Sequence, residues 1–363
     1  MKIGIFTYHI VDNYGAVLQA YCLQEYLRMQ GYDVYIVNYT PDYLIKPYMV
    51  FSYSSQLGDS ILLKAKSFIR ACIVAPMRWI KKVKFQNFRH KYLRLANCDL
   101  SNSQCDFDVF IFGSDQIWNS VISQGVDRIY FGRFKAACNK IILSYSASVG
   151  SVFNIDARTF SLMRLYLKNF NAISVREETL ANYIKEKFKL NVNVVCDPVF
   201  LNDISLLDNI AIKPKENNPY LLLFLMSYDA ESILFAKKTS KKMGLKLVNL
   251  ATYESLLNYQ KQKFVSPEMF IGYIKYASFI ITTSFHGTAF SVLYKKNFYT
   301  LYRNENSNER AFSLLRSLGL EDRMVEIHNC TEVSAVDYSA HVINKLDEIV
   351  LNSKQFLKTN LEN

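Results

Sequence analysis

The feature of this sequence that most constrains its fold is a repeated alternation of short β-rich runs with amphipathic helical stretches. It begins with an expected strand at 3–6, a helix at 16–30 and a strand at 34–38. Gly31 follows the helix, in the place where glycine commonly ends one. Because strands that alternate with helices form parallel βαβ units, the sequence predicts open α/β sheets.

The alternation continues along the chain and is interrupted once, by a polar stretch that contains two prolines. Further strands are expected at 109–112, 141–145, 173–175, 192–195, 220–226, 245–250 and 279–282, and further helices at 230–243, 266–276, 288–293, 309–318 and 333–351. We therefore expect two doubly wound, Rossmann-like domains that face each other across a cleft. The expected divisions are an N-terminal α/β domain at 1–205, a linker at 206–219, a C-terminal α/β domain at 220–330, and a C-terminal helix and tail at 331–363.

Composition limits the class of protein. Half of the residues are hydrophobic and 21% are charged, which is typical of packed domains and excludes wholesale disorder. The seven cysteines contain no C-x-x-C pair and predict reduced thiols rather than a zinc site. His90, His328 and His341 are isolated in the sequence. We therefore expect no metal and no cofactor. The N-terminal run is too short for a signal peptide and no apolar run is long enough to span a bilayer. We expect a cytoplasmic protein, with peripheral binding to the inner face of the plasma membrane as a further expectation.

The net charge of +11 is concentrated in one segment, residues 60–95, which contains ten basic residues and no Asp or Glu. The basic residues are Lys64, Lys66, Arg70, Arg78, Lys81, Lys82, Lys84, Arg89, Lys91 and Arg94, and the apolar residues among them are Ile61, Leu62, Leu63, Phe68, Ile69, Ile73, Trp79, Ile80, Phe85 and Phe88. Cationic helices that carry Trp and Phe bind anionic bilayer surfaces, and this is the partner that we favour. The alternative is that the charge lines an acceptor cleft. Nucleic acid is a third anionic partner, but no reading motif accompanies the segment.

Polar residues follow nearly every expected strand, at the sheet edge where ligands bind in open α/β folds. His286 lies between the strand at 279–282 and the next helix. The N–H groups of such a helix start suit a phosphate or carboxylate, so Ser284, Gly287 and Thr288 are donor-binding candidates. An imidazole beside them can transfer a proton near neutral pH. The alternative is a histidine that only packs or caps in the turn.

Two charged residues at strand ends are candidates with structural alternatives. Arg176 can grip a carboxylate or phosphate with its planar fork, or pair with Glu177 or Glu178. Asp115 can act as a general base or cap backbone amides. For Asp197, which precedes a proline, we favour a turn-forming role.

Four residues that follow the first strand or the strand at 109–112 are candidates for contacting a sugar acceptor. They are His9, Asn13, Tyr14 and Gln116. Asn13 can equally cap the following helix. The sequence contains no G-x-G-x-x-G after a strand, no P-loop, no G-x-S-x-G and no H-E-x-x-H, which argues against dinucleotide oxidoreductases, P-loop kinases, serine hydrolases and zincins.

Taken in order, these blocks resemble the polysaccharide pyruvyl transferase family. The blocks are GIFTYH with NYGAVLQA at 4–20, GSDQIWN at 113–119, SYSAS at 144–148, SVRE at 174–177, CDPV at 196–199 and TTSFHGTAFS at 282–291. Many relatives have an acidic residue at the position where this chain has Thr283. The resemblance extends from residue 1 to about residue 330.

The resemblance implies a fold like that of glycosyltransferase-B enzymes, phosphoenolpyruvate as donor, and a ketal that joins pyruvate to two hydroxyls of one sugar. It implies that His286 is the catalytic acid/base and that Arg176 contacts the donor. The expected acceptor is a capsular polysaccharide or exopolysaccharide, or its lipid-linked precursor. The competing functions are a glycosyltransferase of the same shape that uses a nucleotide sugar, and a scaffold without catalytic activity.

Overall fold

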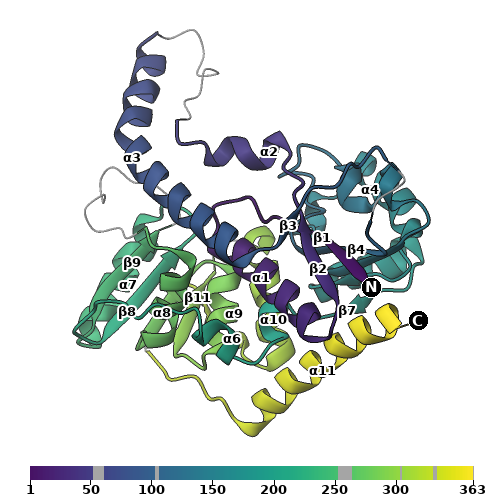
Figure 1. Cartoon of the computed structure of the whole chain (residues 1–363). Coiled ribbons are helices and arrows are strands. Elements are labelled where there is room, and N and C mark those ends of the chain that lie inside the picture. Colours follow the sequence, from purple (N-terminus) through teal and green to yellow (C-terminus); the bar gives the residue numbers. More distant parts are fainter. Residues whose placement is uncertain (52–60, 103–105, 252–263, 303–304, 330–332, 363) are drawn as a thin grey trace.

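The structure, a computed structural model, describes residues 1–51, 61–102, 106–251, 264–302, 305–329 and 333–362. Two parallel sheets with helices packed around them form the two halves of the molecule (Figure 1). The first sheet contains β1 (Lys2–Phe6), β2 (Asp33–Val37), β3 (Leu95–Ala96), β4 (Val109–Asp115), β5 (Ile141–Ala147), β6 (Ser174–Val175) and β7 (Asn193–Val194). The second contains β8 (Tyr220–Leu225), β9 (Lys246–Ala251), β10 (Phe279–Thr282), β11 (Phe298–Leu301) and β12 (Met324–Val325).

The strand orders confirm two doubly wound, Rossmann-like domains. Among the described strands the first sheet runs β3-β2-β1-β4-β5-β6-β7, and the second runs β12-β11-β10-β8-β9. The order reverses between β1 and β4 in the first sheet and between β8 and β10 in the second. In open parallel sheets such reversals open a crevice at the carboxyl ends of the strands. Buried aliphatic and aromatic residues fill these strands, as expected for a sheet covered on both faces.

Helices cover both sheets. They are α1 (Tyr14–Met29), α2 (Asp42–Ile45), α3 (Ile61–Tyr92), α4 (Ala157–Tyr166), α5 (Glu178–Tyr183), α6 (Ser205–Asp208), α7 (Ala230–Lys242), α8 (Pro267–Tyr276), α9 (Phe285–Leu293), α10 (Glu305–Leu318) and α11 (Ala340–Glu362). The helix predicted at 333–351 is wrong in its position, because the helical segment begins at Ala340 and continues to Glu362. The strands β3, β11 and β12 were not predicted. Two of them have only two residues, and β11 follows its helix after a short turn.

Contacts distant in sequence hold the two halves together. The Tyr14 ring, at the start of α1, stacks on Phe270 of α8 with centroids 4.5 Å apart, and its hydroxyl donates to the carbonyl of Val265. The helix α11 runs from the second half back to the first (Figure 1), where the amide of Cys196 donates to Ser353 Oγ at 2.8 Å. Because these contacts bury side chains of both halves, they set the width of the crevice between the sheets. No helix in the described ranges combines the length and the apolar character needed to cross a membrane.

Candidate active site

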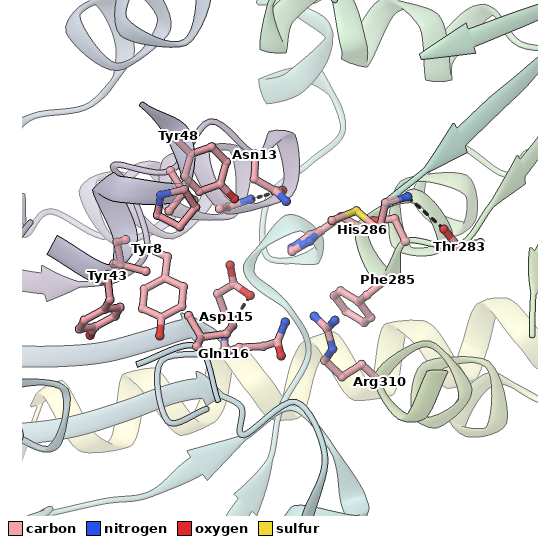
Figure 2. Close-up of a pocket in the computed structure, with 17 residues that line it drawn as sticks. Tyr8, Asn13, Tyr43, Tyr48, Asp115, Gln116, Thr283, Phe285, His286 and Arg310 are labelled. Carbon is pink, nitrogen blue, oxygen red and sulfur yellow. Dashed lines mark hydrogen bonds between the residues drawn. The ribbon is translucent and has the colours of Figure 1, made fainter. Parts of the chain in front are cut away.

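A cavity of about 270 Å³ lies between the two sheets, at the carboxyl ends of β1, β4 and β10 (Figure 2). Its walls come from both halves of the chain: Tyr8, Val11, Asn13, Ala16, Tyr43, Leu44, Pro47, Tyr48, Asp115, Gln116, Ile122, Met226, Thr283, Ser284, Phe285, His286 and Arg310. The cavity therefore occupies the crevice that the two strand orders predict, and it contains five of the ten candidate residues: Asn13, Asp115, Gln116, Ser284 and His286.

His286 lies in the first turn of α9, where β10 ends in the sequence Thr-Thr-Ser-Phe-His. Its ring lies directly against Gly15, at the start of α1, and its Nε2 is 3.5 Å from Asp197 Oδ2. Ser284 is the N-cap residue that precedes this helix, and its side chain makes no capping hydrogen bond among the described residues. The imidazole therefore lies between two helix N-termini and a carboxylate.

Asp197 is the fully buried carboxylate behind this histidine. It accepts from Arg176 at 2.7 Å, from Ser114 Oγ at 3.2 Å and from the amide of Val199 at 3.2 Å. Burial alone would raise its pKa, but His286 and Arg176 outweigh burial and hold the pKa of Asp197 below its usual range. The bond to Val199 is the turn-forming role that the sequence predicted, but the contacts with His286 and Arg176 go beyond it. Asp197 positions the imidazole and keeps a negative charge beside it.

Gly15 is required by the close approach of the His286 ring. A Cβ at this position would lie 2.0 Å from His286 Nδ1, so Gly15→Ala forces the ring to move. We expect this substitution to lower the free energy of unfolding by about 1–3 kcal/mol, as overpacking does. In a His286→Ala background the space is open, and we expect Gly15→Ala to have little effect there. Urea denaturation of the two single variants and the double variant measures the coupling, and equal effects in both backgrounds would contradict the contact.

Arg176 is held by two carboxylates. Its Nε lies 3.2 Å from Glu177 Oε1 and one terminal nitrogen 2.7 Å from Asp197 Oδ2, so the predicted alternative of a pair with Glu177 is present. The other terminal nitrogen is buried and has no hydrogen-bond partner among the described residues. Arg176 lines a neighbouring cavity and stacks on Phe285 at 4.1 Å, and that ring also lines the first cavity. The arginine therefore lies directly behind the wall of the site.

Arg310, on α10, is a cavity residue that the sequence analysis missed. Figure 2 shows its guanidinium pointing toward Phe285 and the cavity. With the amide oxygen of Gln116 turned toward it, that oxygen accepts from both terminal nitrogens at 3.1 Å. Burial and the neighbouring Arg176 lower its pKa, but a guanidinium stays charged at neutral pH. Among the described residues no carboxylate pairs with Arg310, so its charge is available to an anion in the cavity.

An aromatic wall faces His286 and Arg310 across the cavity. It consists of Tyr8, Tyr43 and Tyr48, which lie on the side of the N-terminal half (Figure 2). The sequence analysis did not identify these tyrosines as site residues. Tyr43 is fixed by a 2.6 Å hydrogen bond to Asp127. Flat aromatic rings with hydroxyl groups can pack against the apolar faces of a sugar and bond its hydroxyls.

Asp115 and Asn13 line the cavity beside these tyrosines, Asp115 next to Tyr8 and Asn13 next to Tyr48 (Figure 2). Asp115 has a left-handed φ of 81° and accepts from the amide of Gln116 at 2.8 Å, and its carboxylate lines the cavity. Asn13 caps α1 by accepting from the amides of Gly15 and Ala16, as the alternative prediction stated, and it also lines the cavity. Both residues can therefore contact a ligand as well as stabilise their loops.

Besides Arg176, four sequence candidates do not line the cavity: His9, Tyr14, Gly287 and Thr288. The buried His9 ring bonds the carbonyl of Thr7, and Tyr14 packs between the two halves. Gly287 is covered by Thr282, which a Cβ would meet at 2.2 Å, and the Thr288 hydroxyl is bonded to that of Thr300. These four residues are structural in this arrangement. No group of His, Cys, Asp or Glu in the described ranges is arranged to hold a metal ion.

A family model described as polysaccharide pyruvyl transferase matches residues 13–305 of the chain. The match includes both halves of the fold and every residue of the cavity except Tyr8, Val11 and Arg310. No curated protein matches the chain in sequence.

Several solved structures are similar to the chain over nearly its whole length. The Streptomyces sp. SF2575 glycosyltransferase SsfS6, complexed with thymidine diphosphate, is 10% identical with a TM-score of 0.43, and the match covers 98% of this chain and 96% of that one. The E. coli heptosyltransferase WaaC with ADP is 12% identical with a TM-score of 0.38, and covers 99% and 100%. The Methanocaldococcus jannaschii UDP-GlcNAc 2-epimerase, in complex with UDP-GlcNAc and UDP, is 12% identical with a TM-score of 0.45, and covers 97% and 93%.

Proposed function

The chain belongs to the polysaccharide pyruvyl transferase family, and we propose that it transfers the pyruvyl group of phosphoenolpyruvate to a sugar of a surface polysaccharide or of its lipid-linked precursor. The proposal rests on the side chains that line one cavity. A histidine backed by a buried carboxylate and Arg310, which forms no ion pair with a carboxylate among the described residues, line the same cavity. A proton donor and a fixed cation are what an enol phosphate requires.

The first step is protonation of the donor. His286, in its protonated form, gives a proton to the methylene carbon of phosphoenolpyruvate, which becomes a methyl group and leaves an oxocarbenium-like centre on the neighbouring carbon. One sugar hydroxyl attacks this centre and loses its proton. Asp197, 3.5 Å from the ring, attracts the positive charge of the imidazolium and fixes the ring's orientation.

The second step closes the ketal. The bond between the central carbon and the phosphate oxygen breaks, phosphate leaves with its electron pair, and the second sugar hydroxyl attacks the same carbon. Of the two hydroxyl protons, one replaces the proton that His286 gave up and the other leaves with phosphate. We assign the acceptance of a hydroxyl proton to Asp115, whose carboxylate lines the cavity beside Tyr8. The two carbon–oxygen bonds formed offset the one broken and the lost enol double bond.

The charges of the site suit this donor. Arg310 can hold a carboxylate or phosphate with its planar fork, and the N–H groups at the start of α9 add positive potential from the same side. We assign the sugar to the tyrosine wall on the opposite side of the cavity. In this proposal the donor binds to residues of the C-terminal half and the sugar binds to residues of the N-terminal half. The transferred carbon lies between them.

Arg310→Lys is expected to raise the dissociation constant for phosphoenolpyruvate at least about tenfold, because lysine keeps the charge but loses the paired hydrogen bonds of the fork. Arg176→Lys is also expected to weaken donor binding, because the resemblance implies that Arg176 contacts the donor. Isothermal titration measures both constants, with Arg158→Lys, on α4, as the control. An unchanged constant for Arg310→Lys would remove Arg310 from the donor site.

Ligand-induced stabilisation separates the proposed donor from a nucleotide sugar. A ligand that binds the folded state raises the melting temperature, so phosphoenolpyruvate should raise it and a nucleoside diphosphate should not. The same measurement on Arg310→Lys should show a smaller rise at the same concentration of phosphoenolpyruvate. Stabilisation by the nucleoside diphosphate alone would favour a glycosyltransferase instead.

A further inference from the structure

The helix α3 leaves the body of the molecule at its N-terminal end (Figure 1). We call the part of α3 up to Ile80 the projecting half. Five of its large apolar side chains are exposed to solvent, with exposed fractions between 45% and 59%: Phe68, Ile69, Ile73, Trp79 and Ile80. Their spacing places them on one side of the helix, while Ala71, Val74 and Met77 on the other side are buried. We call these five residues the outer face of α3. A helix on the surface of a soluble protein normally has a polar outer side. Here the buried side and the outer face of α3 are both apolar.

The second half of the same helix shows what a solvated outer side looks like. There the corresponding positions are occupied by Gln86, Asn87, His90 and Lys91, all exposed. The inner positions, Phe85 and Phe88, are buried in the core. The apolar outer face is therefore confined to the half of the helix that projects from the body, and it is not a general property of the helix.

The basic charges of the segment divide in the same way. In the second half, Lys84 donates to the carbonyl of Phe264 at 2.7 Å and Arg89 pairs with the buried Asp12 at 3.0 Å. Beyond the helix, Arg94 lies 3.1 Å from Asp33. These charges serve the fold.

In the projecting half, Lys66 and Arg70 are exposed along one edge of the outer face. The helix contains no Asp or Glu to balance them. Ser60 and the side chains of Ile61, Leu62, Leu63 and Lys64 lie outside the described residues.

We propose that the projecting half of α3 docks the protein on the surface of an anionic lipid bilayer. An apolar face that includes Trp79 and Phe68 enters the region between headgroups and acyl chains, and the cations along its edge meet the lipid phosphates. This is the membrane partner predicted for the basic segment, now limited to the half of it that projects. The proposal does not depend on the reaction catalysed.

Two other partners could cover the outer face, a second copy of the chain or nucleic acid, and the side chains of α3 argue against both. A second copy of the chain, packed through the same face by a twofold axis, would bring like charges together without any acid from α3. Nucleic acid would use the cations but would leave the exposed apolar side chains without a partner. The bilayer surface is the partner that uses both kinds of side chain.

Co-sedimentation with vesicles at physiological salt tests the proposal. We expect the wild type to pellet with mixed phosphatidylcholine–phosphatidylglycerol vesicles, and to stay largely in solution with phosphatidylcholine alone. Each cation near the surface contributes about fivefold in partitioning, so Arg70→Glu should lower the partition coefficient at least about fivefold. Lys91→Glu is the matched control, because it makes the same charge change about 32 Å further along the helix. That distance is several times the screening length of about 8 Å.

The fluorescence of Trp79 reports insertion directly. The other tryptophan, Trp118, is buried and its indole N–H donates to the carbonyl of Tyr130, so a vesicle-dependent change in emission comes from Trp79. We expect a blue shift on addition of the anionic vesicles that disappears in Trp79→Phe. Circular dichroism of each variant verifies that the fold is kept.

Three results would overturn the proposal. One is a wild type that stays in solution and shows no blue shift with anionic vesicles. Another is an equal loss of binding for Arg70→Glu and Lys91→Glu, which would mean nonspecific attraction. The third is a blue shift produced without vesicles, either by a rise in protein concentration, which would indicate a second copy, or by duplex DNA, which would indicate nucleic acid.

Discussion

Replacing His286 by alanine is expected to lower the rate of pyruvyl transfer at least about 10²-fold, the usual contribution of a general acid or base. The ring lies 3.5 Å from Asp197 and faces the cavity, and alanine removes the only proton donor that we assign to the first step. The fold should persist, because the side chain lies at the edge of the cavity between the halves. Phosphate release from phosphoenolpyruvate in the presence of acceptor measures the rate.

The control for this substitution is His328→Ala. His328 is 80% exposed and does not line the cavity, so we expect its replacement to leave the rate unchanged. The dissociation constant for phosphoenolpyruvate should change little in His286→Ala, since the donor's charges are held by Arg310 and by the start of α9. A His286→Ala protein that turns over at the wild-type rate would remove the histidine from the mechanism.

Replacing Asp197 by alanine is expected to lower the free energy of unfolding by about 3–5 kcal/mol, as the loss of one partner of a buried ion pair does. Asp197 is fully buried and Arg176 is 2.7 Å away, so the substitution leaves a buried guanidinium with Glu177 as its remaining ion-pair partner. Urea denaturation measures the change. Asp42→Ala is the control, because the Asp42–Lys46 pair is mostly exposed and should contribute little.

The pH dependence of this effect follows from the lowered pKa of Asp197. A carboxyl group whose pKa is lower in the folded than in the unfolded protein stabilises the fold above its unfolded pKa, near 3.9, and this contribution is lost as the pH falls through the folded pKa. The advantage of the wild type over Asp197→Asn should therefore be full at neutral pH and decline only below about pH 4. An advantage that declined around neutral pH would contradict the charge assigned to Asp197.

The sequence identified the part of the site that depends on strand ends. Parallel strands bring the residues after them to one edge of the sheet, so Asp115, Ser284 and His286 could be placed together without any knowledge of packing. The doubly wound fold followed from the same alternation. The position of the last helix did not, because its later turns are held by contacts with the distant N-terminal half, such as that of Ser353 with Cys196.

The rest of the site depends on contacts between residues far apart in sequence. Arg310 reaches the cavity from within α10, not from a strand end, and nothing in its neighbourhood in the sequence distinguishes it from other helical arginines. Tyr14 lies at a loop where ligands bind, but Phe270 covers it from the other half. Asp197 follows a strand like the other candidates, and that position was the signal of its role beside His286. Its proline neighbour favoured the turn interpretation.

The central claim is pyruvyl transfer, and the most direct test is to incubate the protein with phosphoenolpyruvate and a lipid-linked saccharide pool from the source cells. Phosphate is measured in solution and the saccharides are analysed by mass spectrometry. We predict that phosphate appears in step with a saccharide whose mass has increased by one pyruvyl ketal, and that neither product forms with His286→Ala. Transfer of a sugar from a nucleotide donor, with no ketal formed from phosphoenolpyruvate in the same saccharide pool, would contradict the account.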